Sequence, residues 1–411
     1  MGQKKSPPRV LSLFSGAGGL DLGLEAAGFD MRLCVELDED ARVTLSANRP
    51  TWTLATPGDI HEHEPKDLLA QAELEPGEVE LLAGGPPCQP FSKSGYWSSG
   101  DSRRLRDPRA NTLRAYLNVV ETARPRVVLL ENVRGLAYEG KAEGLELLTR
   151  GLKSINKRQG TCYRASVFHL NAADFGVPQI RERVFVIADR EGKPFTPPAQ
   201  THGDGAGRQR HHTAWDAIGD LATEQHDDLD LTGKWAALLP SIPEGQNYLW
   251  HTPEGGGTPL FGWRTKFWSF LLKLAKNRPS WTIQASPGPA TGPFHWNNRQ
   301  LSTRELCRLQ TIPDDYVIEG NRRAAQRQIG NAVPCALAEV LGLAIRSQLL
   351  GDAAVPTAAT LIPERSKETP RATACVSVPL EYNHLCGKHQ PHGGTGRGPS
   401  ARKRMLRQRP G

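Results

Sequence analysis

Cys88 is the residue whose setting in this sequence best suits nucleophilic chemistry. It lies in GGPPCQPFS (residues 84–92), directly after a short apolar run that we expect to be a buried strand. Prolines on both sides restrict the backbone, so they fix the direction of the cysteine sulfur. A thiol with an ordinary pKa is only about 3% thiolate at neutral pH, so the site must lower that pKa or remove the proton during attack. A lone cysteine is more often a small buried hydrophobic residue, but this one lies in a proline-held loop.

Glu131 and two arginines offer charged groups for the same site. Glu131 ends another apolar run, in LLENV, where a carboxyl group is costly unless it has a partner. Arg181 and Arg183 stand two residues apart in QIRER, at the start of a predicted strand, so strand alternation places both on one face. Paired guanidinium groups suit an oxyanion, a phosphate or a carbonyl oxygen. The structural alternatives are a salt bridge for the glutamate and a solvated strand edge for the arginines.

A glycine-rich turn, LFSGAGG (residues 13–19), follows the first apolar run. Its glycines permit a tight turn and a close approach of the backbone to a ligand. It is not a dinucleotide fingerprint, because Asp21 stands at the position of the third glycine. Glu36 ends the next predicted strand, where a carboxylate can accept hydrogen bonds from both hydroxyls of a ribose, and Asp59 is a candidate for the edge of a base. Together these features favour a nucleoside-type cofactor over a tight turn without a ligand.

The elements that must position these groups alternate between strands and helices. Short apolar runs predict strands at 10–14, 31–37, 79–82, 127–130 and 184–188, and helical spacing predicts helices at 20–27, 111–124 and 143–155. This alternation is typical of the α/β class. We predict a doubly wound, mainly parallel sheet, with the candidate groups at the carboxyl edge of its strands.

The sequence changes in character after residue 189. Residues 190–295 are rich in Gly, Pro, His and Trp and have weak periodicity, which predicts a second, smaller, irregular domain with one helix near 264–276. Further helices are predicted at 301–310 and 335–349, the second packed on the sheet. The predicted units are a first domain at 1–190, the irregular domain at 191–321, a return to the first domain at 322–351 and a basic, disordered tail at 352–411.

Composition excludes several classes of protein. No window of the 411 residues approaches 18 consecutive apolar residues, and the N-terminus lacks the apolar stretch of a signal peptide. Seven cysteines without a CxxC pair argue against a disulfide framework or a structural metal site and indicate a reducing cytosol. Most of the net charge of +7 lies in the tail, because residues 365–411 hold ten Lys or Arg and two Glu. The charge alone therefore does not predict nucleic-acid binding by the folded part.

Taken in order, these motifs resemble those of the cytosine-C5 DNA methyltransferases of bacterial restriction-modification systems, which use S-adenosylmethionine. The markers follow one another in family order between about residues 10 and 349: LFSGAGGLDLGLEAAGF, VELDEDA, GDI, GGPPCQPFS, ENV, QIRER, RQLSTRELCRLQTIPDDY and RQIGNAVP. The resemblance implies a Rossmann-like methyltransferase fold in which residues 191–321 form the target-recognition domain.

The resemblance also implies a role for each site residue, and it implies no metal. Cys88 would be the nucleophile, Glu131 the carboxyl group that binds the N3/N4 edge of cytosine, and Arg183 a ligand of O2. Arg181 would hold a phosphate or the loop. The residues that would bind S-adenosylmethionine are Phe14, Ser15, Gly16, Gly18, Gly19, Glu36, Leu37, Asp59, Ile60 and Asn331. The candidate DNA contacts in the recognition domain are Arg208, Arg210, His211, Arg264 and Lys266.

The implied activity is methylation of cytosine C5 in duplex DNA. A target base would be flipped out of the helix and attacked at C6 by Cys88, and residues 92–109 would be either a loop that closes over it or a plain surface loop. The implied partners are double-stranded DNA and, as a genetic partner only, a cognate restriction endonuclease. The chain would be a cytoplasmic monomer without a membrane partner.

Three alternatives remain at this stage. The first is an RNA cytosine-5 methyltransferase, although the long variable region favours reading of a duplex. The second is an inactive DNA-binding relative, against which the intact Cys88, Glu131 and Arg183 argue. The third is a nicotinamide-dependent oxidoreductase, which the incomplete glycine turn disfavours.

Overall fold

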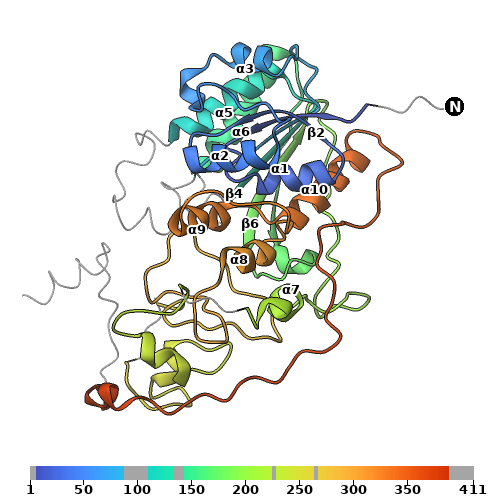
Figure 1. Cartoon of the computed structure of the whole chain (residues 1–411). Helices are drawn as coiled ribbons and strands as arrows, with labels where there is room; N and C mark the ends of the chain where they lie inside the picture. The colour runs from blue at the N-terminus through green and yellow to red at the C-terminus, as the bar shows by residue number, and fades with distance from the viewer. Residues whose placement is uncertain (1–5, 88–109, 134–142, 225–227, 263–266, 388–411) are drawn as a thin grey trace, which may run out of the picture.

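The structure is a computed structural model, and it describes residues 6–87, 110–133, 143–224, 228–262 and 267–387. Cys88, the segment 92–109, Arg264 and Lys266 lie outside the described residues. Figure 1 shows a sheet flanked by helices in one half of the molecule and irregular chain in the other.

Nearly all the regular elements belong to the half that contains the sheet. The strands are β1 (Arg9–Leu13), β2 (Asp30–Val35), β3 (Leu81–Gly84), β4 (Val127–Val133), β5 (Ser166–Asn171) and β6 (Glu182–Asp189). The helices are α1 (Gly19–Ala26), α2 (Glu39–Asn48), α3 (Pro65–Gln71), α5 (Ala110–Ala123), α6 (Glu143–Gln159), α7 (Ala214–Ile218), α8 (Thr303–Leu309), α9 (Arg322–Asn331) and α10 (Cys335–Gln348). Of these, α2, α3, α7 and α9 were not among the helices predicted from apolar spacing.

The six strands form one mixed sheet in the order β2-β1-β3-β4-β6-β5. Strands β1 to β4 run parallel, whereas β6 runs antiparallel to both β4 and β5. The prediction of an α/β fold with a doubly wound, mainly parallel sheet is confirmed. Because β1 pairs with β2 on one side and with β3 on the other, the direction of winding reverses at β1. Open α/β sheets bind ligands in the crevice at such a point, outside the carboxyl ends of the strands.

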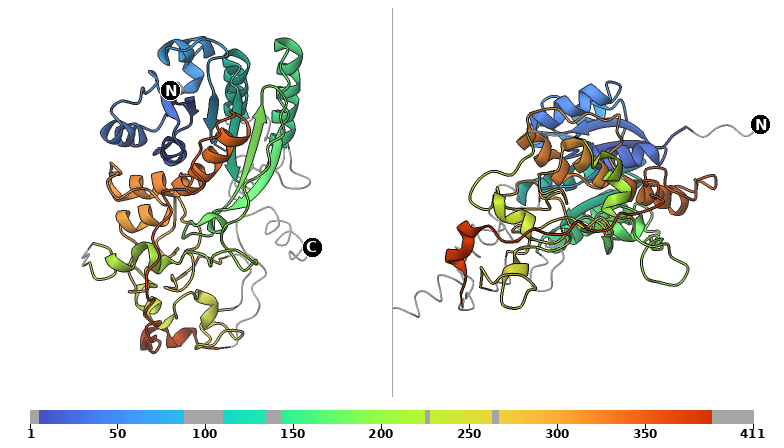
Figure 2. Two further views of the ribbon diagram at one scale, coloured as in Figure 1. Left: turned by 90° about the vertical axis from the view of Figure 1, so that its right-hand side faces the viewer. Right: turned by 60° about the horizontal axis from the view of Figure 1, so that its bottom comes forward.

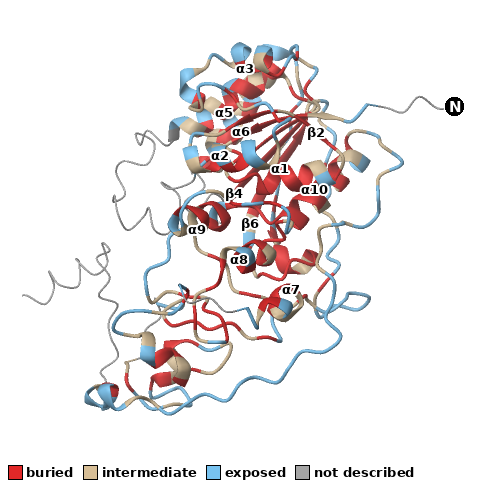
Figure 3. Ribbon diagram, viewed as in Figure 1, coloured by how far each residue is buried: buried red, intermediate tan, exposed pale blue. Residues whose placement is uncertain are grey.

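Alternate side chains of the strands enter two separate apolar cores. Val10 and Leu129 belong to the core that includes α1 and α10. Leu11 and Leu130, the next residues along the same strands, belong to the core that includes α3, α5 and α6. This sorting follows from the two-residue period of a strand. It gives three layers, with a buried sheet between two sets of helices (Figures 2 and 3).

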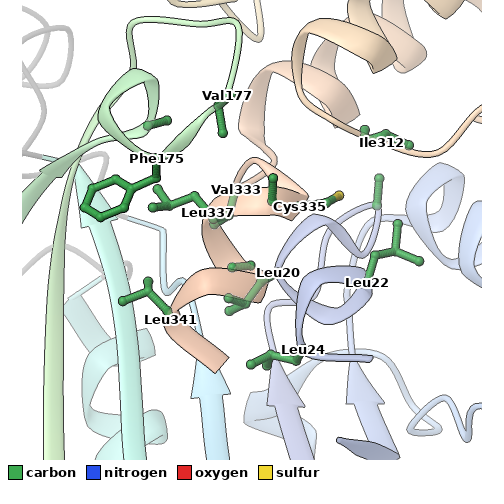
Figure 4. Close-up of a cluster of buried hydrophobic side chains, with 14 of the residues drawn as sticks. Leu20, Leu22, Leu24, Phe175, Val177, Ile312, Val333, Cys335, Leu337 and Leu341 are labelled. Atoms are coloured by element: carbon green, nitrogen blue, oxygen red, sulfur yellow. The ribbon is translucent and has the colours of Figure 1, made fainter. Parts of the chain in front are cut away.

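Helices α1 and α10 pack closely, although they are more than 300 residues apart in sequence. A Cβ atom added to Gly23 would lie 2.3 Å from the Cys335 carbonyl oxygen and 2.4 Å from the Ala338 Cβ. Figure 4 shows the apolar side chains of α1 beside Leu337 and Leu341 of α10. The stretch Arg322–Gln348 is long and apolar enough to resemble a membrane-crossing helix, but 83% of its most apolar window is buried inside the protein, as in the core helices of soluble folds. The predicted return of the chain to the first domain therefore consists of helices that belong to the protein core.

The irregular region after β6 differs from expectation at one point. A helix was predicted near 264–276, but the described residues 267–276 form turns and extended chain. Phe270 forms a β-bridge with Thr291, and Lys273 forms one with Phe294. This stretch therefore pairs with an extended segment about twenty residues later and does not form a helix. The positive φ of Leu271, 51°, also does not fit a helix. Pairing with a segment distant in sequence here outweighs the helical spacing of the apolar residues.

A third apolar core fills the far end of this region, and we call it the distal core. Its buried members are Leu238, Leu239, Ile242, Tyr248, Leu260, Leu271, Phe294 and Tyr382. All but the last come from residues 238–294. Tyr382 comes from the segment after α10.

Residues 352–387, which we call the strap, correct the prediction of a disordered tail. In Figure 1 the strap runs along the outside of the molecule from α10 to the far end of the irregular region, where it forms the short 3₁₀ helix η8 (Leu380–Leu385). It makes hydrogen bonds to several elements, beginning with Glu339 of α10. The Ala, Thr and Pro content that suggests disorder is compatible with an extended segment whose polar backbone is satisfied by partners. The prediction is wrong for 352–387, while 388–411 lie outside the described residues.

Gly23→Ala tests the contact between α1 and α10. The added methyl group would overlap backbone of α10, so we expect the free energy of unfolding to fall by about 1–3 kcal/mol. Urea denaturation followed by far-ultraviolet circular dichroism measures the change. Ala26→Ser on the exposed face of α1 is the control and should stay within about 0.5 kcal/mol. Equal stability of the Gly23 variant and the wild type would show that the two helices do not pack this closely.

Candidate active site

A cavity of about 680 Å³ lies at the carboxyl edge of the sheet, where the winding reverses. This volume is within the range of small-molecule and cofactor sites. Ten of the predicted site residues line it: Phe14, Ser15, Gly16, Glu36, Leu37, Asp59, Ile60, Glu131, Arg183 and Asn331. These predicted residues come from the ends of four strands, from the segment at 59–60 and from the end of α9, and the structure brings them together.

The glycine-rich turn forms one wall of the cavity. Phe14, the first residue after β1, has φ 59°, a left-handed conformation that is strained for a non-glycine residue and is often found at functional sites. Gly16 has φ 56°, and no atom lies within 4 Å of where its Cβ would be, so its backbone faces open space. Gly18 and Gly19 instead face the protein, since a Cβ on Gly19 would lie 2.5 Å from the Val333 carbonyl oxygen. These two glycines permit packing, and only the first part of the turn meets the cavity.

Glu36 is held at the end of β2 by backbone donors. Its Oε2 accepts a hydrogen bond from the Gly16 N–H at 2.6 Å, and its Oε1 accepts one from the Asp38 N–H at 2.7 Å. Burial raises the pKa of this carboxyl group, and the two backbone donors oppose that effect. Each carboxylate oxygen has further lone pairs, so the group can still accept hydrogen bonds from a ligand in the cavity.

Three further segments also line the cavity. Asp59 caps a short turn, η1 (Ile60–Glu62), through a hydrogen bond of 2.9 Å from the His61 N–H to its Oδ1. Leu37 is 67% exposed beside the opening, although it is apolar. Asn331 ends α9 and also lines the cavity. An exposed leucine and a buried isoleucine at a cavity wall suit a flat apolar group such as a purine ring.

A charged pair also lines the cavity. Arg183 Nε lies 2.9 Å from Glu131 Oε1, and both side chains are largely buried. Burial raises the pKa of Glu131, while the positive charges of Arg183 and Arg181 oppose the rise. The carboxyl group is thus able to hold a proton more readily than an exposed glutamate, and it is fixed in one orientation by the guanidinium.

The loop that leads to Cys88 begins at this pair. A Cβ on Gly85 would lie 3.1 Å from Glu131 Oε2, and Pro86 and Pro87 line the same cavity. Asn132 Nδ2 donates a hydrogen bond of 3.1 Å to the Pro86 carbonyl oxygen, which ties the loop to β4. The chain therefore reaches position 88 directly from the wall of the cavity. Cys88 itself lies outside the described residues.

Arg181 does not line the cavity. It precedes β6, is fully buried, and donates hydrogen bonds to the carbonyl oxygens of Ile283 (3.2 Å) and Gly330 (2.7 Å). Strand β6 begins only at residue 182, so Arg181 lies just before it, and the prediction from strand alternation applies to Arg183 alone. The two hydrogen bonds of Arg181 link the irregular region to the end of α9.

Three groups at the site were missed from sequence. Arg327 makes ion pairs with Asp38 and Asp40 at the rim of the cavity, and Asn132 anchors the loop described above. Asp21 is fully buried beneath the glycine-rich turn, near Ser12 and Ser15, and burial raises its pKa to about 7. The signal for Asp21 was present, since it is a carboxyl group on the apolar face of a predicted helix.

The candidate DNA contacts that the structure describes lie on the irregular region. Arg208 and Arg210 are exposed, and His211 is half-buried with its Nε2 3.0 Å from Asp174 Oδ1. The backbone carbonyl of Arg210 accepts a hydrogen bond from Arg365 of the strap. None of the three lines the cavity.

Comparison with known proteins identifies the family to which this chain is similar. Residues 8–347 match the family model described as C-5 cytosine-specific DNA methylase. The chain is 41% identical over 371 residues to the Type II methyltransferase M.SacI of Streptomyces achromogenes, covering 83% of this chain and 93% of the relative. It is 31% identical over 341 residues to M.NgoFVII of Neisseria gonorrhoeae, also a Type II methyltransferase, covering 81% and 85%. The fold is similar to that of a mutant of Spodoptera frugiperda DNMT2, with a TM-score of 0.58, 17% identity and coverage of 82% and 99%.

Arg183→Ala tests the charged pair through stability and its pH dependence. Removing the guanidinium leaves Glu131 buried beside one fewer positive charge, so we expect a loss of about 3 kcal/mol near pH 8. The pKa of Glu131 in the folded state should rise further above the unfolded value, so the folded state binds a proton that the unfolded state does not. The deficit should therefore be smaller near pH 5 than near pH 8, because the carboxyl group is protonated to a greater extent at the lower pH.

Urea denaturation at the two pH values measures this effect. The control is the double variant Arg183→Ala with Glu131→Gln, which should lose the pH dependence because no carboxyl group remains. A deficit of the same size at both pH values would show that the pair is not coupled electrostatically.

Proposed function

Because this chain belongs to the C-5 cytosine-specific DNA methylases and is a DNA (cytosine-5)-methyltransferase, we propose that it modifies a specific site in duplex DNA by covalent catalysis from Cys88. The observation that carries the proposal is the single cavity that joins the glycine-rich turn to the Glu131–Arg183 pair and to the start of the Cys88 loop. A cofactor and a base bound at its two ends would lie next to each other.

The cofactor of the proposal is S-adenosylmethionine, and the residues present fit it. Gly16 leaves open space at the turn, Glu36 has free lone pairs for ribose hydroxyls, and Leu37 and Ile60 offer apolar surface for adenine. Asn331 would line the same part of the cavity. When bound, this cofactor supplies an electrophilic methyl group.

Cys88 would act on the cytosine ring. C5 of cytosine is a weak nucleophile, and addition of the thiolate to C6 saturates the 5,6 double bond and makes C5 enamine-like. After the methyl group is in place, loss of the C5 proton and expulsion of the Cys88 thiolate restore the aromatic ring. The prolines at 86 and 87 restrict the chain that leads to the sulfur.

Glu131 and Arg183 would hold the ring during that addition. Electron density moves toward N3 as the sulfur bonds to C6, and a proton held by the Glu131 carboxyl group can stabilise it. The raised pKa of this buried group supports the role, since a carboxyl group that keeps its proton can donate a hydrogen bond. The guanidinium of Arg183 would bind O2 and keep the carboxyl group oriented.

A cytosine stacked in a duplex cannot enter a cavity at the edge of a sheet, so the proposal includes flipping of the base at a cost of a few kcal/mol. Residues 191–321 would then form the target-recognition domain, between a catalytic domain at 1–190 and its return at 322–351. Arg208, Arg210 and His211 are the described candidates for DNA contacts.

In the cell, the proposed role is protection of host DNA from a cognate restriction endonuclease. The support is that the relatives are named as Type II methyltransferases. The enzyme would act as a monomer in the cytoplasm.

Cys88→Ala tests the covalent step. We expect methyl transfer to fall by at least about 10⁴-fold, while affinity for S-adenosylmethionine changes little, because the cofactor contacts lie elsewhere in the cavity. Transfer of labelled methyl groups to DNA and calorimetric titration with the cofactor measure the two effects. Near-normal turnover of the variant would disprove covalent catalysis by this residue.

Duplex DNA with 5-fluorocytosine provides the companion measurement. The target site is first found by bisulfite sequencing of DNA from cells that express the chain. A denaturant-resistant adduct should form at that site with the wild type but not with Cys88→Ala, since fluorine cannot leave as a proton does. Transfer to tRNA but not to DNA would instead favour the RNA methyltransferase.

Glu36→Gln tests the cofactor wall. One amide cannot accept from both the Gly16 and Asp38 N–H groups and also from a ribose, so we expect the dissociation constant of S-adenosylmethionine to rise about 10- to 100-fold. Glu39→Gln, which removes the same charge at an exposed position of α2, should bind as the wild type does. Unchanged affinity of the Glu36 variant would place the ribose elsewhere.

A further inference from the structure

The strap connects α10 to both ends of the irregular region through buried carboxylates. Glu339 of α10 is 1% exposed, and it accepts hydrogen bonds from the backbone N–H groups of Thr360 (2.7 Å) and Leu361 (2.8 Å). Asp216 of α7 accepts one from the Ser366 N–H at 2.9 Å. Three backbone N–H groups of the strap thus donate hydrogen bonds to two carboxylates on separate helices.

A third carboxylate continues the pattern near the distal core. Glu244 Oε1 accepts a hydrogen bond of 2.9 Å from the Thr373 N–H, and it pairs with Lys276 Nζ at 2.5 Å. Both charged side chains of this pair are less than one tenth exposed. A carboxylate so buried is costly without hydrogen bonds, so each anchor fixes the strap as well as its own element. The fourteen residues from Thr360 to Thr373 can span at most about 45 Å, enough to bridge the two parts of the molecule.

Tyr382 is the end point of the strap. Its ring is 3% exposed and is stacked on Trp235, with centroids 5.9 Å apart and planes 13° from parallel. Its hydroxyl group donates a hydrogen bond of 2.8 Å to the Lys234 carbonyl oxygen. The strap therefore supplies one of the aromatic members of the distal core.

We propose that the strap positions the distal part of the recognition domain (residues 229–262 and 267–294) for DNA binding, with Tyr382 as the positioning residue. The inference rests on the proposed function of this domain as the reader of DNA sequence. The distal part has a small core, and its described residues contain short 3₁₀ turns but no α-helix, so little within it fixes its placement. Reading of base edges requires side chains held to within about 0.5 Å, which a loose unit cannot supply.

Tyr382→Ala is the central experiment. Without the ring, we expect KM for cognate DNA to rise about tenfold, while kcat and the affinity for S-adenosylmethionine stay within about twofold, because misplacement acts on binding of DNA. Hydrogen exchange provides a readout independent of activity. The amides of Leu271 and Leu274, which bond to carbonyl groups of Ala290 and Phe294, should exchange at least about tenfold faster, while those of β4 keep their rates.

Two matched variants separate positioning from general damage. Tyr382→Phe keeps the stacked ring and should restore KM to near the wild-type value. Leu380→Ala removes an apolar side chain that is 83% exposed on the same 3₁₀ helix, and it should change neither KM nor exchange. A chain that ends after residue 387 keeps the whole strap and should bind DNA as the wild type does.

Three results would overturn the proposal. One is unchanged KM for DNA and unchanged exchange in Tyr382→Ala. Another is faster exchange in the distal part with no change in KM. The last is a loss of cofactor affinity and of β4 protection in Tyr382→Ala, which would assign the residue to overall stability.

If the wild type transfers no methyl group to DNA, the proposed function fails, and hydrogen exchange alone then decides. Faster exchange in Tyr382→Ala supports the strap as the element that orders the distal part, and unchanged exchange rejects it.

Discussion

The antiparallel direction of β6 is the constraint on which the site depends. Val133 at the end of β4 pairs with Arg183 at the start of β6, and only an antiparallel strand brings its first residues to the carboxyl edge of β4. A parallel strand would place Arg183 at the opposite edge, and Glu131 would be buried without this partner. One reversed strand in an otherwise parallel neighbourhood therefore decides whether a carboxyl group can be held inside the cavity.

The same edge explains how one cavity would serve the two ligands of the proposed function. The winding reverses at β1, so the chain segments after β1 and β2 lie on one side of the crevice and those after β3 and β4 on the other. The first pair of segments carries the turn and Glu36, and the second carries Gly85 and Glu131. In the proposed function, the sheet topology would thus separate the cofactor from the base, while a shared cavity would keep them in contact.

The sheet and most of the cavity could be predicted from the sequence because their signals are local. An apolar run followed by a glycine turn or an acid marks a strand end, and strand ends of a parallel sheet meet. Arg181 lies one residue before β6, where strand alternation does not apply, and its guanidinium donates hydrogen bonds to two backbone carbonyl groups from distant segments. The predicted helix near 264–276 failed for a related reason, since its leucines pair with chain some twenty residues later.

The strap shows why such long-range features escape a reading of composition. Its residues are mostly small, polar or proline, and an isolated chain of this kind cannot bury enough apolar surface to fold. Its order comes from partners, because Glu339, Asp216 and Glu244 each accept a hydrogen bond from a backbone N–H of the strap. The signal in the sequence lies instead in the helix that the strap contacts. An acid within the apolar helix 335–348 predicts that some other segment covers it. Buried acids in strongly apolar elements are therefore a guide to where an apparently disordered tail is held.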